Sequence, residues 1–162
     1  MPAPDPAEVE TLTWSVGDLQ EAGRAGRLAI SAFDPHFREA WTEGQITGLL
    51  ATPSAWLEVG RVDKTMLAFA LCRQVLDEVE LLLCATSPGW RRRGLGRQLV
   101  CQVTHRARER GATRLFLEVR SSNEPAIALY TACGFAAIGR RPDYYRTMAD
   151  ERIDAITLSL KL

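Results

Sequence analysis

Residues 81–111 constrain the fold more than any other stretch, because they place a strand, a glycine-containing turn and a helix in immediate succession. Residues 81–85, Leu-Leu-Leu-Cys-Ala, form an apolar run of strand length that leads into a Ser-Pro-Gly turn signal. After the turn at residues 91–97, apolar residues recur every four positions, which is the spacing of one helical face; they are Leu95, Leu99, Val103 and Ala107. Gly111 stands where a helix C-cap is expected.

The turn itself, Arg-Arg-Arg-Gly-Leu-Gly-Arg, is typical of a phosphate-binding loop. A helix N-terminus offers unpaired backbone N–H groups and a partial positive charge, so it stabilises an anion. Gly94 and Gly96 permit close approach to the backbone, and the preceding arginines add positive potential. A solvated basic turn is the alternative interpretation. The nucleotide motifs GxxxxGK[ST] and GxGxxG are both absent from this stretch.

A known family has the observed spacing. Arg91, Gly94 and Gly96 occupy the defining places of [Q/R]-x-x-G-x-[G/A], so the segment resembles the acyl-CoA pyrophosphate loop of the GNAT superfamily of N-acetyltransferases. The resemblance implies acetyl-CoA as co-substrate and no metal. It also implies that the preceding strand pairs with the pantetheine arm through its backbone, although the usual residues there are closer to Ile-Ala-Val. The implied acetyl-CoA contacts are Cys84, Ala85, Thr86, Arg91, Arg92, Arg93, Gly94, Leu95, Gly96 and Asn123.

A second motif makes the resemblance more specific. Residues 117–135, LEVRSSNEPAIALYTACGF, are similar to the LEVR-x-S-N-x-x-A-I-x-L-Y-x-x-x-G-F signature of the bacterial ribosomal-protein alanine N-acetyltransferases. That branch acetylates the N-terminal amine of ribosomal protein bS18. The match covers residues 66–160 well and the first 55 residues only in outline. It implies a protein N-terminus as acceptor, with bS18 and its N-terminal alanine as the candidate.

Two side chains within the second motif have the residue types that acyl transfer needs. Transfer from a thioester to an amine requires that the ammonium lose a proton and that the leaving thiolate gain one. The resemblance places the general base at Glu118 and the general acid at Tyr130. A glutamate on an apolar strand loses part of its hydration, which makes it a better base. The alternatives are a strand carboxylate paired with Arg120 or Arg114, and a half-buried helix tyrosine.

Other roles at the expected site also have two interpretations. Asn123 is either an acetyl-CoA contact or a helix cap, and both roles are compatible. The cysteines have no neighbouring histidine and no nucleophile motif, so we expect direct transfer in a ternary complex. An α-amine has a reference pKa of about 7.7–8.0 against about 10.4 for lysine, which favours an N-terminal acceptor. Lysine or small-molecule acetylation and a non-catalytic acyl-CoA-binding module remain as alternatives.

Composition excludes several classes of protein. The chain has 162 residues, with 20 basic and 20 acidic side chains, so its balance of charge recruits neither nucleic acid nor an anionic membrane. No apolar run approaches the roughly 18 residues that span a bilayer, and the first residues do not read as a signal peptide. We therefore expect a cytoplasmic protein.

The four cysteines lie singly in apolar segments, which predicts buried reduced thiols without disulfide or zinc; they are Cys72, Cys84, Cys101 and Cys133.

The order of the predicted elements indicates an α+β domain with a mixed, mainly antiparallel central sheet flanked by helices on both faces, and the resemblance implies that this is the GNAT fold. Residues 1–10 carry three prolines and read as a flexible lead-in, and residues 11–162 read as one N-acetyltransferase domain. Capping boxes at Asp18 and Thr42 predict two helices, the first running to about Ile30. Between them, the aromatic loop 33–37 reads as apolar packing or as part of a substrate groove.

The second half of the chain completes the predicted sheet. A meander of strands is expected over residues 56–85, followed by strands at 113–120, 135–139 and 156–160 and a helix from Asn123 to Gly134. Residues 140–152 read as a polar loop that forms part of the acceptor site. The basic side chains of this loop read either as binders of an acidic acceptor or as solvated groups; they are Arg140, Arg141 and Arg146.

Overall fold

The computed structural model of the chain describes residues 12–162, so the predicted lead-in at residues 1–10 lies outside the described residues. The strands are β1 (Thr13–Gly17), β2 (Ala55–Val62), β3 (Thr65–Val75), β4 (Glu78–Thr86), β5 (Arg114–Arg120), β6 (Ala136–Arg146) and β7 (Arg152–Lys161). The helices are α1 (Ala22–Ala32), α2 (Glu43–Leu50), α3 (Leu95–Glu109) and α4 (Glu124–Ala132), with short 3-10 turns η2 (Leu19–Glu21), η3 (Pro35–Phe37) and η4 (Pro88–Trp90).

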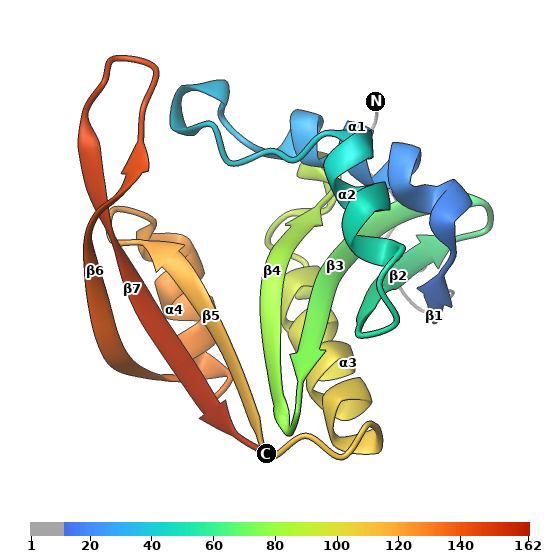
Figure 1. Cartoon of the computed structure of the whole chain (residues 1–162). Coiled ribbons are helices and arrows are strands. Elements are labelled where there is room, and N and C mark those ends of the chain that lie inside the picture. Colours follow the sequence, from blue (N-terminus) through green and yellow to red (C-terminus); the bar gives the residue numbers. More distant parts are fainter. Residues whose placement is uncertain (1–11) are drawn as a thin grey trace.

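The seven strands form one mixed sheet in the order β1-β2-β3-β4-β5-β7-β6. Neighbours run antiparallel except for β4 and β5, which are parallel. Helices α1 and α2 pack on one face around one apolar cluster, whereas α3 and α4 cover the other face around a second cluster (Figure 1). The predicted mixed sheet with helices on both faces is therefore confirmed.

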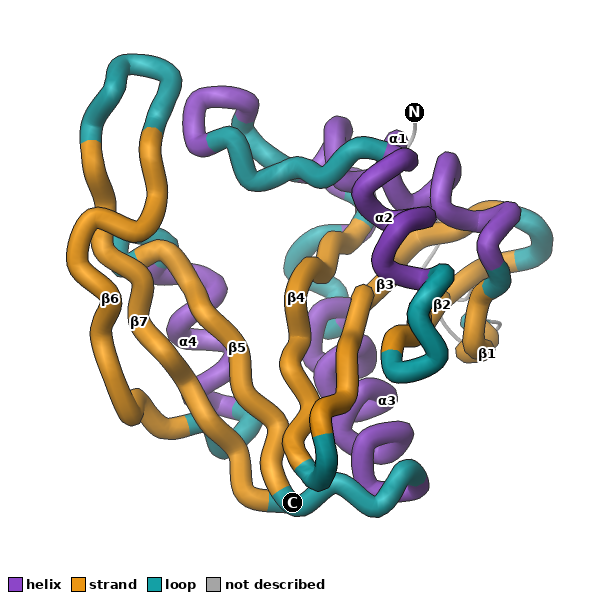
Figure 2. The backbone as a smooth tube through the Cα atoms, in the orientation of Figure 1, coloured by secondary structure: helices purple, strands orange, loops and turns teal. Residues whose placement is uncertain are grey.

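The parallel pair is joined along only part of its length. Glu78 to Leu81 of β4 pair with Arg114 to Leu117 of β5, yet β4 continues to Thr86 and β5 to Arg120. Figure 2 shows the two strands close together at one end and separating toward the other. Beyond Leu81, β4 is paired with β3 alone. The sheet therefore presents free strand edges at its centre, which a bound extended group is able to occupy.

Helix α3 begins and ends at the glycines that the sequence indicates. Gly94 is the N-cap with φ +78°, and Gly111 follows the helix with φ +80°, so both adopt the left-handed region that favours glycine. Leu95, Leu99 and Val103 are buried against the sheet, as the four-residue spacing predicts. The predicted strand, loop and helix order of residues 81–111 is thus confirmed.

The strongest polar feature of the core was not predicted. Glu58, in the middle of β2, is 0% exposed, and Arg106 of α3 binds its carboxylate at 3.1 and 3.3 Å. The guanidinium also contacts Glu109 one helical turn away at 3.0 Å. A buried carboxylate without its partner is strongly destabilising. Arg106 therefore has to stay beside Glu58, and this holds α3 against the sheet. The two residues lie 48 positions apart, so no local pattern indicated the pair.

The N-terminal elements differ from the prediction in part. Strand β1 was not predicted. Asp18 caps the 3-10 turn η2 rather than α1, since its carboxylate accepts from the Gln20 N–H at 2.9 Å. Glu21 pairs with Arg61 of β2 instead of completing a capping box. The capping box of Thr42 with Gln45 at the start of α2 is confirmed.

The C-terminal hairpin is longer than predicted. Residues 140–152, expected as a polar loop, mostly continue strands β6 and β7, and only 147–151 connect them. The register between these strands shifts between Arg141 and Tyr145, where Asp143 has φ +54°. The Asp154 carboxylate accepts from the Asp143 N–H at 2.9 Å and from Arg140 at 2.6 Å. Pro142 thus sits in a bulged strand, which the sequence pattern does not distinguish from a loop.

Candidate active site

The glycine turn leads directly into α3, and Gly94 supplies no side chain to cap the first amides of that helix. A Cβ placed on Gly94 would meet no atom within 4 Å, so the space over the backbone is open. Arg92 also adopts a left-handed conformation, with φ +60°, which turns the chain tightly before the helix. Uncapped N–H groups beside open space form a site for an anionic group, consistent with the predicted phosphate loop.

The arginines of this turn have separate local environments. Arg91 reaches back to donate to the carbonyl of Ala32, the last residue of α1, at 2.5 Å. Arg93 lies over the Trp90 ring, with its Cζ 5.5 Å from the ring centroid, and Arg92 is exposed. Their contacts with acetyl-CoA remain a prediction.

Gly96 has a packing role that the sequence did not indicate. A Cβ at this position would come within 3.1 Å of the Leu129 Cδ2 of α4. The missing side chain therefore lets α3 and α4 approach each other where the two helices meet over the sheet.

Tyr130 reaches from α4 to the part of β4 that pairs with β3 but not with β5. Its hydroxyl lies 3.1 Å from the Cys84 Sγ, and the tyrosine is only 7% exposed. Burial raises the pKa of the Tyr130 phenol well above its ordinary value, with the neighbouring Cys84 as a further cause. Burial also raises the pKa of the Cys84 thiol. The phenol is therefore held in its neutral, proton-donating form near neutral pH.

Glu118 is the first residue of β5 beyond the part that pairs with β4. Its side chain is 9% exposed and forms an ion pair with the Arg141 Nε of β6 at 2.8 Å. Two tyrosines of the same hairpin adjoin it. Burial first, and then the Glu118 carboxylate, raise the pKa of Tyr144, and the Tyr145 hydroxyl donates to the Glu118 carbonyl at 3.3 Å.

Glu118 is thus ion-paired, but not with either of the partners considered from the sequence. Arg120 pairs with Glu39, and Arg114 lies 4.0 Å from Glu78. The partner is instead Arg141, which comes from β6, two strands away in the sheet order.

Asn123 has one of its two expected roles. Its Oδ1 accepts from the Ala126 N–H at 3.3 Å, so Asn123 is the N-cap of α4, and Pro125 stands in the first turn. The same helix carries Tyr130 two turns further on. The cap thus helps to fix where the tyrosine emerges, while the contact with acetyl-CoA remains a prediction.

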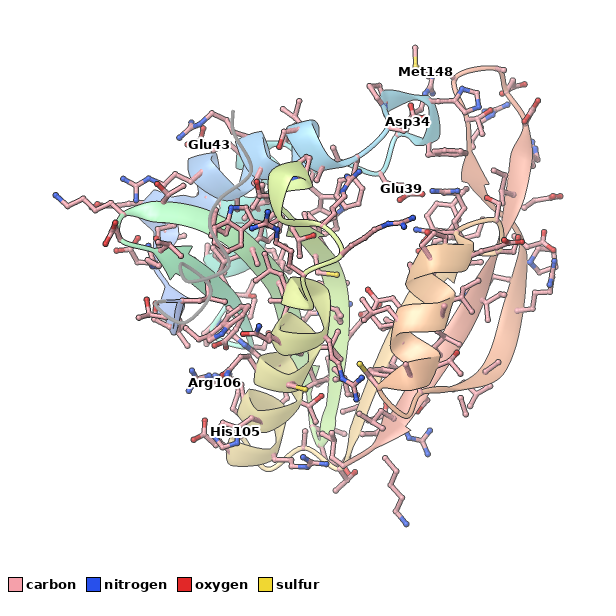
Figure 3. All side chains as sticks on the ribbon, turned by 180° about the vertical axis from the view of Figure 1, so that it is seen from behind. Asp34, Glu39, Glu43, His105, Arg106 and Met148 are labelled. Carbon is pink, nitrogen blue, oxygen red and sulfur yellow. The ribbon has the colours of Figure 1, made fainter. Side chains whose placement is uncertain are left out.

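The segment between α1 and α2 contacts β5 and the β6–β7 hairpin, and we call these contacts the bridge between the two halves of the sheet. The segment between α1 and α2 includes η3, and the His36 carbonyl accepts from the Met148 N–H at 2.8 Å, in the β6–β7 connection. Arg120 of β5 pairs with Glu39 and places its Cζ 3.5 Å from the Phe37 ring centroid. Figure 3 shows the Asp34 and Glu39 region beside the Met148 turn. The aromatic loop thus contacts the hairpin, beyond the interhelical packing considered from the sequence.

The three arginines singled out in the hairpin each form an ion pair within the chain. Arg140 binds Asp154, Arg141 binds Glu118, and Arg146 binds Asp150. The structure therefore gives each of these three arginines an acidic partner within the chain, while their side chains stay more than half exposed to solvent.

The thiols also differ from the prediction at one position. Cys72 is buried and Cys84 and Cys133 are partly buried, but Cys101 of α3 is exposed, so the expectation of four buried thiols is wrong there. Within residues 12–162, no group of three or more His, Cys, Asp or Glu side chains is placed to hold a metal ion. No helix in the described part of the chain is long and apolar enough to cross a membrane.

Comparison with known proteins identifies the family and agrees with the fold. The model of the acetyltransferase (GNAT) family matches residues 22–135. The "[Ribosomal protein bS18]-alanine N-acetyltransferase" of Escherichia coli strain K12 is 44% identical over 97 residues, which are 60% of this chain and 65% of that protein. The matched segment thus spans just under two thirds of this relative.

Solved structures extend the likeness over nearly the whole chain. The crystal structure of the ribosomal-protein-S18-alanine N-acetyltransferase from Escherichia coli superposes with a TM-score of 0.84 at 32% identity and covers 93% of each chain. The structure of yncA from Salmonella typhimurium, determined with its cofactor acetyl-CoA, has a TM-score of 0.77 at 16% identity and covers 94% of each chain.

Proposed function

The chain belongs to the acetyltransferase (GNAT) family, and we propose that it transfers the acetyl group of acetyl-CoA to a protein N-terminus, the N-terminal alanine of ribosomal protein bS18. One observation carries the proposal. Where β4 and β5 separate, β5 carries a partly buried carboxylate and β4 faces a buried phenol, and these are the two proton-handling groups that amide formation from a thioester requires.

The chain's own groups account for binding of the donor. Acetyl-CoA supplies an activated acyl group on a thioester. The open turn at Gly94 and the first amides of α3 suit its pyrophosphate, since both N–H groups and helix dipole favour negative charge. Residues 82–86 of β4 have backbone groups on the edge that faces away from β3, which suits an extended amide-containing arm.

The proton steps follow from the two side chains. Glu118 takes a proton from the acceptor ammonium, so that the free amine attacks the thioester carbonyl. The carbon–sulfur bond then breaks as the carbon–nitrogen bond forms, and Tyr130 donates its hydroxyl proton to the leaving sulfur. The second amine proton leaves on amide formation, and Tyr130 recovers one from solvent. The overall products are the N-acetyl peptide, CoA-SH and one released proton.

The acceptor class rests on the relatives and on elementary acid–base chemistry. An α-amine loses its proton far more readily near neutral pH than a lysine amine does, with reference pKa values of about 7.7–8.0 and 10.4. A modest base therefore suffices for an α-amine, and the Glu118 carboxylate, which is ion-paired with Arg141, is the proposed one. The relatives that match at 44% identity are named for this acceptor.

The test is CoA release from acetyl-CoA by the purified chain. The acceptors are a peptide with the bS18 N-terminal sequence beginning with alanine, the same peptide with a blocked N-terminus, a lysine-bearing blocked peptide and a set of small amines. We expect turnover on the free N-terminus alone. Turnover on the lysine peptide or on small amines alone would assign another acceptor, and binding of acetyl-CoA without turnover would contradict an enzymatic role.

A further inference from the structure

The thiol of Cys84 is the hydrogen-bond partner that the structure gives to the Tyr130 hydroxyl, at 3.1 Å. The two residues lie 46 positions apart, on β4 and α4, so the contact joins the strand edge to the helix that carries the proposed acid. The phenol ring is also held edge-on against Phe135, with centroids 5.6 Å apart. The ring contact fixes the plane of the ring, and the thiol contact holds the phenol oxygen in place.

From this geometry we propose that Cys84 is a positioning residue for Tyr130, and that its thiol aligns the phenol proton with the leaving sulfur. The inference rests on the proposed function, because it assumes that Tyr130 acts as the acid. It concerns the side chain of Cys84 alone and is separate from the predicted backbone contact with the pantetheine arm.

The chemistry of a thiol and a phenol in contact supports the role. When the Cys84 S–H donates to the phenol oxygen, the single O–H of Tyr130 is left to point elsewhere. As the carbon–sulfur bond of acetyl-CoA breaks, the O–H bond of Tyr130 breaks and an S–H bond forms on CoA. The S–H of Cys84 then donates to the phenolate oxygen that results, and no covalent bond of Cys84 changes. A hydrogen bond to a charged acceptor is stronger than one to a neutral acceptor, so the contact strengthens during the step.

Burial argues against a nucleophilic role for the same thiol. Desolvation raises the pKa of Cys84, and the thiolate is the nucleophilic form of cysteine. The neutral thiol remains a donor, which is the form that a positioning role requires. An aliphatic side chain of similar size at this position would pack equally well but would leave the phenol without this partner.

The test is a double-mutant cycle in the acetyl-CoA and alanine-peptide assay. Cys84→Ala and Cys84→Val each remove the donor, and Val also restores volume. We expect both to lower kcat about tenfold, the effect of one hydrogen bond, while KM for acetyl-CoA changes by less than about threefold. Cys84→Ser keeps a donor and should recover kcat to within about threefold of the wild type. Cys72→Ala removes a buried thiol of the adjacent strand β3 and should leave kcat unchanged.

The cycle is completed in the Tyr130→Phe background, with melting temperature and acetyl-CoA affinity measured for every variant. If Cys84 acts through the phenol, Cys84→Ala causes no further loss once the hydroxyl is gone. An equal tenfold loss in both backgrounds, or a Cys84→Val enzyme as active as the wild type, would overturn the inference. A fully active Tyr130→Phe enzyme would instead overturn the proposed acid itself, so the two failures are distinguishable.

Discussion

The two sides of the site are built in different ways. The cofactor side, which we define as residues 82–97, is continuous in the chain and uses mainly backbone groups: a strand edge, a glycine turn and a helix N-terminus. The acceptor side, which we define as residues 33–41 together with 118–120 and 140–152, is assembled from three distant segments by side-chain pairs. From this difference we expect that the proposed donor site tolerates most changes of side chain, whereas the proposed acceptor site depends on individual ion pairs.

The first prediction concerns the residue where the two sides meet. Glu118→Gln removes the proposed base while keeping shape, so kcat should fall about 10²- to 10⁴-fold with nearly unchanged acetyl-CoA affinity. Steady-state kinetics and calorimetry measure the two quantities. Glu80→Gln is the matched control, because Glu80 is a strand glutamate that pairs with Arg73. Unchanged turnover in Glu118→Gln would remove the base from the mechanism.

The second prediction tests the backbone character of the cofactor side. Gly94→Asp places a negative side chain at the helix N-terminus where pyrophosphate is expected, so the Kd for acetyl-CoA should rise about 30-fold or more. Gly94→Asn is the control, since asparagine tolerates the left-handed conformation without adding charge, and its Kd should stay within about fivefold. Wild-type affinity in Gly94→Asp would show that the anion binds elsewhere.

The third prediction tests whether the acceptor side depends on single pairs. Glu39→Ala leaves Arg120, which is 11% exposed, without its carboxylate, and should lower the free energy of unfolding by about 1–3 kcal/mol. Glu78→Ala breaks the exposed ion pair with Arg114 and should change the free energy of unfolding by less than about 0.5 kcal/mol. Chemical denaturation compares the two. Equal losses of stability in the two variants would contradict a larger stabilising role for the Glu39–Arg120 ion pair.

The fourth and smallest effect concerns Arg141. Its guanidinium occupies a carboxylate oxygen of Glu118, so Arg141→Gln frees that oxygen for the acceptor ammonium and should raise kcat/KM for the peptide about threefold, without changing acetyl-CoA affinity. Arg140→Gln is the matched control, because Arg140 is adjacent to Arg141 and similarly exposed but pairs with Asp154. A loss of activity in Arg141→Gln would mean that the guanidinium orients the carboxylate rather than competing for it.

The same contrast explains what the sequence predicts and what it does not. The strand, turn and helix of the cofactor side could be predicted because their signals are local: an apolar strand run, glycines that permit left-handed φ and a helical four-residue spacing. Asn123 as a cap and the box at Thr42 are local in the same sense and are confirmed.

The remaining features depend on contacts between distant residues. The pairs Glu118–Arg141, Glu39–Arg120 and Glu58–Arg106 join residues 23, 81 and 48 positions apart, and nothing near any of them indicates its partner. Strand β1 and the long hairpin β6–β7 exist because neighbouring strands supply hydrogen bonds, which local propensity underestimates. The Cys84–Tyr130 contact belongs to this group as well, since it spans β4 and α4.

The most direct test of the central claim is a crystal structure of the chain with CoA bound. The claim is that acetyl transfer takes place where β4 and β5 separate, between Tyr130 and Glu118. We predict that the arm of CoA lies along residues 82–86 and that its sulfur lies within hydrogen-bonding reach, about 3.5 Å, of the Tyr130 hydroxyl. A sulfur on the far side of α3 or α4, or a pyrophosphate away from Gly94, would contradict it.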